Sequence, residues 1–218
     1  MKNKIKEISE GWWWPIDDGI DKKDGSPSDQ SCWNYMQSQP DLPLLVSDYV
    51  KNKNVVVQAG GNCGFYVKQY SQLFQTVYTF EPDPVNFYCL NLNVTENNVF
   101  KFQSCLGELH GTVGLDNYLS DVGATHVKGE GNVPVLLVDD LNLTACNLIH
   151  LDIEGYELFA LRGASKTIEK FKPVICIEHH DEWSRRYEHG LNEIEREIFR
   201  HGYTHVGNAH LDRVYKVI

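Results

Sequence analysis

Apolar, β-branched runs that each precede a segment with helical spacing constrain this chain more than any other feature. "NVVVQAG", which starts at Asn54, is followed by "FYVKQYSQLF", and "TVYTFEP" is followed by "VNFYCLNLN", a predicted helix with Pro84 near its start. "VFKFQSCLG" is predicted as a third strand. Strands that alternate with helices pair in parallel through right-handed crossovers, so the sequence predicts a sheet covered by helices on both faces.

The second half of the chain continues this alternation after an interruption at residues 106–138, where short strand-like pieces predict a β insertion. "NLIHLD" is predicted as the fourth main strand, "YELFALRGASKTIEKF" as its helix, "PVICIEHH" as the fifth strand and "LNEIEREIFRHG" as a helix with a glycine stop. The last residues, "YTHVGNAHLDRVYKVI", predict an antiparallel hairpin. Residues 11–43 are rich in Trp, Asp, Ser and Pro without periodicity, so residues 1–50 are expected to form an irregular arm or lid.

Composition excludes several classes of function. Twenty Lys and Arg against thirty Asp and Glu give a formal charge of −10, without the cation cluster that a nucleic-acid binder needs. No run of 18 apolar residues is present, so no membrane span is expected. The six cysteines form no C-x-x-C pair and are expected to be reduced core residues. Because "MKNKIKEISEG" lacks an apolar signal region, we expect a cytoplasmic protein.

A glycine turn after the first strand favours a nucleoside-type cofactor. Gly60, Gly61 and Gly64 allow a tight turn and a close approach of a ligand to the helix N-terminus. Glu81 lies twenty residues beyond Gly61 at the end of the second strand, where a carboxylate commonly accepts hydrogen bonds from a ribose diol. A nicotinamide dinucleotide and S-adenosylmethionine both fit these residues. The predicted C-terminal hairpin favours S-adenosylmethionine, because a dinucleotide fold would instead complete a second mononucleotide-binding half.

Five blocks, in order, resemble the signature blocks of the FkbM family of S-adenosylmethionine-dependent methyltransferases. They are "VVVQAGGNCG", "YTFEPDPVNF", "VDDL", "HLDIEGYELFALRGA" and "KPVICIEHH", and they cover roughly residues 54–180. "GWWWPIDD" is also similar to the opening of short members of the family. The resemblance implies an α/β, Rossmann-like class I methyltransferase fold over residues 51–218. Such a fold has a mostly parallel, doubly wound sheet of about seven strands with a C-terminal antiparallel hairpin.

The resemblance also implies a cofactor site. The glycine turn would wrap the methionine end of S-adenosylmethionine, Glu81 would hold the ribose, and Ser104 and Cys105 would flank the adenine. The expected cofactor-binding residues are Gln58, Ala59, Gly60, Asn62, Gly64, Glu81, Pro82, Ser104, Cys105 and Asp152. The family usually has aspartate where Gln58 stands, and we expect Gln58 to hydrogen-bond the ammonium group of the cofactor through its amide oxygen.

Carboxylates at strand ends are the expected catalytic groups. Asp152 ends the fourth strand, at the switch point where an open parallel sheet binds its ligand, and Glu178 ends the adjacent strand. A hydroxyl acceptor has a high pKa and needs a base or a metal, so Asp152, Glu178, His179 and His150 are the candidates. Asp152 and Glu178 are also candidate ligands of a Mg- or Ca-type cation. In a competing metal-free mechanism, Asp152 orients the hydroxyl while His179 or His150 takes its proton.

Structural interpretations compete with several of these assignments. His150 is more often a satisfied core histidine, and Glu154 and Glu157 suit the N-terminal turn of the following helix. Tryptophan faces stack on sugar rings, so Trp13, Trp14, Asp17 and Asp18 are candidate saccharide-binding residues, but a structural lid is the competing interpretation.

The sequence therefore predicts an S-adenosylmethionine-dependent O-methyltransferase that acts on a hydroxyl of a saccharide or small metabolite. The alternative is a catalytically weak or inactive binding protein with the methyltransferase fold, motivated by Gln58. A nicotinamide-dependent oxidoreductase is the third hypothesis.

Overall fold

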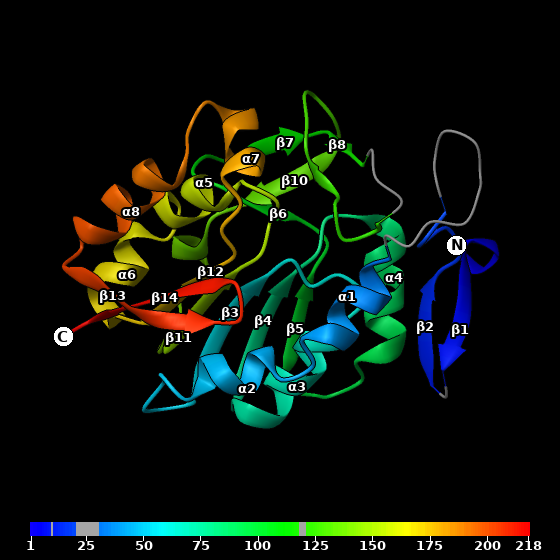
Figure 1. The fold of residues 1–218 in the computed structure, drawn as a ribbon, viewed down its shortest axis with the longest axis horizontal. Helices are drawn as coiled ribbons and strands as arrows, with labels where there is room; N and C mark the ends of the chain where they lie inside the picture. The colour runs from blue at the N-terminus through cyan, green and yellow to red at the C-terminus, as the bar shows by residue number, and fades with distance from the viewer. Residues whose placement is uncertain (10, 21–30, 118–120) are drawn as a thin grey trace.

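The computed structural model describes residues 1–9, 11–20, 31–117 and 121–218. Its main sheet has seven strands in the order β13-β14-β12-β11-β3-β4-β5 (Figure 1). The parallel strands are β3 (Val55–Ala59), β4 (Thr76–Phe80), β5 (Val99–Phe102), β11 (Leu148–Leu151) and β12 (Val174–Ile177). β13 (Tyr203–Ala209) and β14 (Asp212–Val217) form an antiparallel hairpin, and β14 pairs antiparallel with β12. The predicted mostly parallel α/β sheet with a C-terminal hairpin is therefore confirmed.

Helices cover both faces of this sheet because its central strands are apolar on both sides. Val56 packs in one core with α2 (Leu42–Ser47), α3 (Phe65–Leu73) and α4 (Pro84–Asn93). Its neighbour Val57 points to the opposite face and packs with α5 (Glu157–Arg162), α6 (Ser165–Phe171) and α8 (Leu191–Phe199). Successive side chains of a strand alternate between faces, which explains why these strands are continuous apolar runs in the sequence.

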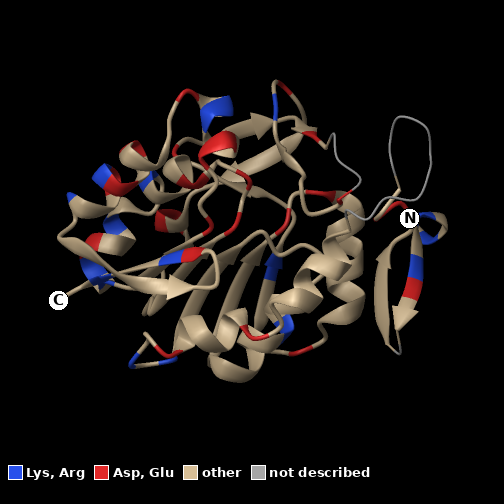
Figure 2. Cartoon of the chain, in the orientation of Figure 1, with Lys and Arg blue, Asp and Glu red and all other residues tan. Residues whose placement is uncertain are grey.

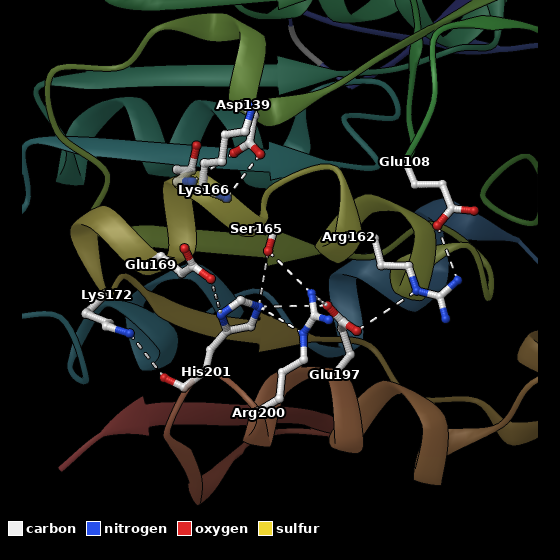
Figure 3. A network of polar contacts seen from close by, with 11 residues as sticks. Glu108, Asp139, Arg162, Ser165, Lys166, Glu169, Lys172, Glu197, Arg200 and His201 are labelled. Carbon is white, nitrogen blue, oxygen red and sulfur yellow. Dashed lines mark hydrogen bonds and ion pairs between the residues drawn. The ribbon is translucent and has the colours of Figure 1, made fainter.

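A polar network fixes the outer helices (Figure 3). Ser165 Oγ lies 3.5 Å from His201 Nε2, which links α6 to the turn after α8. The side chain of Asp139, in the "VDDL" block, accepts hydrogen bonds from the N–H groups of Lys166 and Thr167 at 3.0 and 2.8 Å. Asp139 therefore caps α6, whose own N-cap residue has no polar side chain.

The N-terminal arm is more regular than the irregular segment that we expected. β1 (Ile5–Ser9) and β2 (Trp12–Pro15) form a hairpin, and α1 (Cys32–Ser38) precedes α2. The side chain of Asn93 on α4 accepts from the N–H of Trp13 and donates to its carbonyl, at 2.7 and 2.8 Å. A tertiary contact from α4 thus supports β2, and this contact leaves no periodic pattern in the sequence.

The segment after β5 leaves the main sheet earlier than predicted. β5 ends at Phe102, so Ser104 and Cys105 do not belong to the third strand. The small strands that follow are β6 (Cys105–Leu106), β7 (Gly111–Val113), β8 (Leu115–Asp116), β9 (His126–Val127) and β10 (Val133–Leu136). β10 joins β6 and β7 in one sheet, and β8 pairs with β9. These strands lie beside the carboxyl ends of the main sheet (Figure 1).

The predicted helix after β11 is divided at Gly163 into α5 and α6. A Cβ atom on Gly163 would lie 1.9 Å from the carbonyl oxygen of Gly107, so the close packing of these two segments requires glycine at position 163. The remaining elements are α7 (Asp181–Ser184) and the 3₁₀ turns Lys2–Lys4, Val138–Leu141 and Arg185–Tyr187. All six cysteines are buried and free, as predicted. None of the helices in the described ranges is long and apolar enough to cross a lipid bilayer.

Candidate active site

A cavity of about 310 Å³ lies at the carboxyl ends of β3, β4, β11 and β12. β3 and β11 are neighbours in the sheet although the chain forms β4 and β5 between them, so the cavity is at the switch point of the sheet. The arm contributes α1 to its wall, and the insertion contributes residues 121–127 except for the buried Val122. Figure 2 shows acidic segments in the loops beyond the central strands.

The glycine turn after β3 packs directly against the end of β11. Gly60 has a φ of +86°, and a Cβ atom there would lie 1.9 Å from the carbonyl oxygen of Asp152. Gly60 and Asn62 line the cavity, as the cofactor assignment requires. Gly64, which we also expected to bind the cofactor, does not line the cavity. It precedes α3 with a φ of +95°, and a Cβ there would lie 2.5 Å from the Val94 side chain, so Gly64 permits the approach of α4 instead.

Glu81 follows β4 and is held in one position. It is 4 % exposed, and its two oxygens accept the N–H groups of Asn62 and Asp83 at 2.7 and 2.8 Å. Burial raises the pKa of Glu81 to about 8. The structure therefore supplies a fixed carboxyl group beside the glycine turn, where the sequence places the ribose.

Four further predicted residues, Ala59, Pro82, Ser104 and Cys105, line the same cavity. The hydroxyl of Ser104 is buried and has no hydrogen-bond partner among the described residues. A buried hydroxyl without a partner is costly, so it favours a ligand that bonds to it. Burial raises the pKa of Cys105 to about 12, so its thiol stays protonated.

Gln58 is placed differently from the expectation. It is 1 % exposed and lies outside the cavity lining. Its amide nitrogen donates to the carbonyl oxygen of Gly60 at 2.8 Å, and its amide oxygen accepts from the Thr79 hydroxyl at 2.6 Å. The Gln58 amide therefore stabilises the glycine turn. The expectation that it bonds the ammonium group of a cofactor is wrong, because both ends of the amide are already engaged within the protein.

Three carboxyl groups meet in the cavity. One oxygen each of Asp152, Glu154 and Glu178 lie within 4.8 Å of one another. Burial, together with the nearby Asp212, raises the pKa of Asp152 to about 6. Burial, followed by the charges of Asp152 and Glu154, raises the pKa of Glu178 well above its usual range. At neutral pH, Glu178 is therefore the protonated member of the pair and donates the hydrogen bond that it shares with Asp152.

Glu154 is a cavity residue that the sequence interpretation assigned to the following helix. Its φ is +59°, a strained value for a residue with a side chain, and its Oε2 atom is buried without a hydrogen-bond partner among the described residues. Glu157 instead supports the loop, since its Oε1 accepts the N–H groups of Ile153 and Gly155 at 3.1 and 3.2 Å. The sequence does contain a signal for this position of Glu154, because the acid-glycine pair in "DIEG" is typical of a tight turn rather than of a helix.

His150 is a satisfied core histidine, the competing interpretation for this residue. It is 1 % exposed and does not line the cavity. Its Nδ1 lies 2.7 Å from the Tyr70 hydroxyl and its Nε2 lies 2.9 Å from Asp212 Oδ2. Both ring nitrogens are engaged, so His150 is not available as a base.

His180 takes the place that we assigned to His179. His179 lies in a separate open hollow, with its Nε2 3.6 Å from Asp181. His180 lines the cavity, with its Nε2 3.8 Å from Glu178 Oε1. Extended chain alternates its side chains, so Glu178 and His180 share one side and His179 faces the other.

The arm residues that we expected to bind a saccharide do not line the cavity. Trp14 is 1 % exposed and donates from Nε1 to Asp18 at 2.8 Å, whereas Trp13 and Asp17 are exposed on the outside of the arm. Asp18 also accepts the N–H groups of Cys32 and Trp33 on α1 and of Val122 in the insertion. The arrangement favours the structural-lid interpretation. Of the arm residues that the structure describes, Cys32, Tyr35 and Met36 line the cavity.

Solved structures share this fold at low sequence identity. An FkbM methyltransferase from Methylobacillus flagellatus KT is 20% identical with a TM-score of 0.50, over 77% of this chain and 44% of that one. A TehB-like S-adenosylmethionine-dependent methyltransferase from Corynebacterium glutamicum is 11% identical with a TM-score of 0.50, over 85% and 94% of the two chains. A ribosomal protein L11 methylase from Lactobacillus delbrueckii subsp. bulgaricus is 10% identical with a TM-score of 0.50, over 98% of each.

Sequence comparison identifies the family. No curated protein sequence matches this chain significantly. The sequence profile of the methyltransferase FkbM domain matches residues 54–204, well over half of the chain. The matched region contains the glycine turn, Glu81, Asp152 and Glu178, which are the residues around which the cavity is built. This protein belongs to the FkbM family of methyltransferases.

Proposed function

We propose that this protein is a cytoplasmic, S-adenosylmethionine-dependent O-methyltransferase that acts on a hydroxyl of a saccharide or another small metabolite. One observation carries the proposal. A single cavity at the switch point brings together the glycine turn, the fixed carboxyl of Glu81, the unpartnered hydroxyl of Ser104 and the ionised Asp152.

The residues of the cavity fit the cofactor. Gly60 and Asn62 line the space proposed for the methionine end, Glu81 is the proposed partner of the ribose, and the unpartnered Ser104 hydroxyl is the proposed partner of the adenine. The cofactor, when bound, supplies an electrophilic methyl group on its sulfonium. The protein has to hold the acceptor oxygen in line with that methyl group at about 3–3.5 Å.

Asp152 is the proposed base. In the transfer, the acceptor oxygen forms its bond to the methyl carbon, the sulfur–methyl bond breaks, and the acceptor hydroxyl proton passes to the Asp152 carboxylate. Glu178, protonated and hydrogen-bonded to Asp152, orients that carboxylate, and His180 lies on the outer side of Glu178. A positioned base of this kind contributes about 10²–10⁴-fold to the rate.

A Mg- or Ca-type cation at Asp152 and Glu178 remains a prediction. The three clustered carboxyl groups are hard oxygen donors of the type that such cations prefer. Activity measured after exhaustive chelation, with and without added Mg²⁺, separates the two mechanisms. Full activity after chelation eliminates the metal role.

Titration calorimetry with S-adenosylmethionine and S-adenosylhomocysteine tests the proposal, and we expect saturable binding of both. No binding at millimolar ligand contradicts it. Because Gln58 stands where the family usually has aspartate, a binding protein that lacks catalysis stays the alternative. A methylated product with any acceptor eliminates that alternative. Transfer of an isotopically labelled methyl group to a panel of hydroxyl compounds gives this second answer.

A further inference from the structure

The acceptor end of the cavity is acidic beyond what the proposed reaction needs. Asp121, Asp152, Glu154 and Glu178 all line the cavity in addition to Glu81, and no lysine or arginine does so among the described residues. S-adenosylmethionine carries a net single positive charge, whereas the described lining holds five carboxyl groups and no cationic side chain. Burial raises the pKa of Glu154 well above its usual range, and a cation bound beside this group would favour its ionised form.

Among the described acids of the cavity, Glu154 has a buried oxygen atom that lacks a hydrogen-bond partner. Its Oε2 is buried and unpartnered among the described residues, and its φ of +59° is held by the fold. Arg186 donates to the backbone oxygen of Glu154 at 3.4 Å, and its guanidinium lies 4.3 Å from the centre of the Trp183 ring. Arg186 is outside the cavity lining, so it does not occupy the space that Glu154 faces.

We propose that the acceptor carries a protonated amine beside the hydroxyl that is methylated, and that Glu154 binds this ammonium group. The inference rests on the proposed function of the same cavity. Tyr35, Tyr66 and Trp183 line the cavity with these acids, and aromatic rings favour organic cations near their faces. An acceptor with a phosphate or carboxylate in this place would meet several carboxyl groups, and none of the described lysines and arginines lines the cavity to compensate for them.

An ammonium group and a divalent metal make different demands on this site. Mg²⁺ and Ca²⁺ take six or more oxygen ligands, so a metal at the three carboxyl groups would need water or the acceptor to complete its coordination. An ammonium group needs hydrogen-bond acceptors, and the unpartnered Oε2 of Glu154 is one. Amino sugars and amino alcohols are the acceptor classes with this chemistry.

The experiment compares small probes that differ in one substituent. The protein saturated with S-adenosylhomocysteine is titrated, in EDTA, with 2-aminoethanol, ethylene glycol and glycolate, and then with glucosamine, glucose and glucuronate. We expect each amine to bind at least about tenfold more tightly than its neutral partner, the equivalent of about 1.4 kcal/mol. We expect the two acids to bind more weakly than the neutral compounds.

Variants assign the preference to Glu154. Glu154→Gln should abolish the preference for amines while retaining S-adenosylhomocysteine binding, and Glu154→Asp should keep part of it. Glu130→Gln, a change in an exposed acid outside the cavity, should leave the preference unchanged. Amines that bind no better than their neutral partners overturn the inference, as does a preference that survives Glu154→Gln.

Two further outcomes are informative. In a separate titration without EDTA, Mg²⁺ that binds in place of the amines, with its affinity lost in Glu154→Gln, overturns the inference in favour of a metal. If S-adenosylhomocysteine fails to bind, the proposed function fails. The same amine titrations on the ligand-free protein then still decide whether Glu154 recognises an ammonium group.

Discussion

At the residue scale, Glu81 links the glycine turn to the end of β4 and faces the cavity. We expect Glu81→Ala to weaken the binding of S-adenosylmethionine about tenfold or more, because it removes the carboxyl group proposed to bond both ribose hydroxyls, and each hydrogen bond contributes about 0.5–1.5 kcal/mol. Glu81→Gln keeps the shape and one oxygen, so its affinity should lie between the two. Calorimetry measures the dissociation constants, and equal constants for wild type and Glu81→Ala refute the ribose assignment.

The raised pKa of Asp152 predicts how the activity depends on pH. A base with a pKa of about 6 loses its ionised form as the pH falls, so kcat/KM should decline tenfold per unit below about pH 6. Asp152→Asn should reduce kcat/KM about 10²-fold or more at pH 7.5 and retain S-adenosylhomocysteine binding. The pH–rate profile and the variant's kinetics check both statements. Unchanged activity in Asp152→Asn removes Asp152 from either mechanism.

At the scale of elements, Asp18 joins three segments. Its carboxylate accepts hydrogen bonds from Trp14 in β2, from the start of α1 and from Val122 in the insertion. Asp18→Ala should release α1 from the cavity wall, weaken cofactor binding and lower the melting temperature. The matched change Asp17→Ala, in the exposed neighbour, should alter neither. Calorimetry and thermal unfolding measure these effects, and a weaker acceptor affinity in Asp17→Ala would restore the saccharide-binding interpretation.

Asp139 gives a second prediction at this scale. It caps α6 from another element, so Asp139→Ala should cost about 1 kcal/mol of the free energy of unfolding, in the range of a lost N-cap. Asp140→Ala, which removes an exposed ion pair with His110, should cost less than about 0.5 kcal/mol. Urea unfolding measures both variants. Equal costs for the two changes would show that the contact at α6 contributes no special stability.

At the scale of the whole molecule, buried acids couple stability to pH. Burial raises the pKa of Glu157 to about 7, so the folded state holds a proton that the unfolded state has lost. This contribution is complete below about pH 4.5 and is lost as the pH rises through about 7. The lowered pKa values of His126 and His201, caused by burial, act in the opposite direction near pH 6, so the informative quantity is a difference between variants.

Glu157→Gln provides that difference, because glutamine keeps an acceptor oxygen for the two N–H groups and cannot ionise. We expect the stability of this variant relative to wild type to increase by about 2–3 kcal/mol between pH 4.5 and pH 8. Urea unfolding across this range measures the increase. A difference that does not depend on pH shows that Glu157 ionises normally in the folded protein.

The order of the main strands and helices along the chain could be predicted from the sequence, and so could the strand ends that line the cavity. β3, β4, β11 and β12 need apolar side chains on both faces because helices cover both, and this requirement is visible as continuous apolar runs. Glycine at position 60 is equally visible, because the turn has to pass against the backbone of β11. The acids after β4, β11 and β12 follow from the same logic, since parallel strands end at one edge of the sheet.

Which polar side chains enter the cavity could not be predicted from the sequence, because it depends on contacts between distant segments of the chain. His179 and His180 are adjacent in the sequence, and the direction in which the chain leaves β12 selects His180. Gln58 and His150 find partners on other strands, Thr79 and Asp212, so neither is free for a ligand. Glu154 enters the cavity through a left-handed backbone conformation that its own side chain disfavours. Apolar periodicity records burial, but hydrogen-bond partners distant in the chain leave no such record, and the fold must be known before they can be assigned.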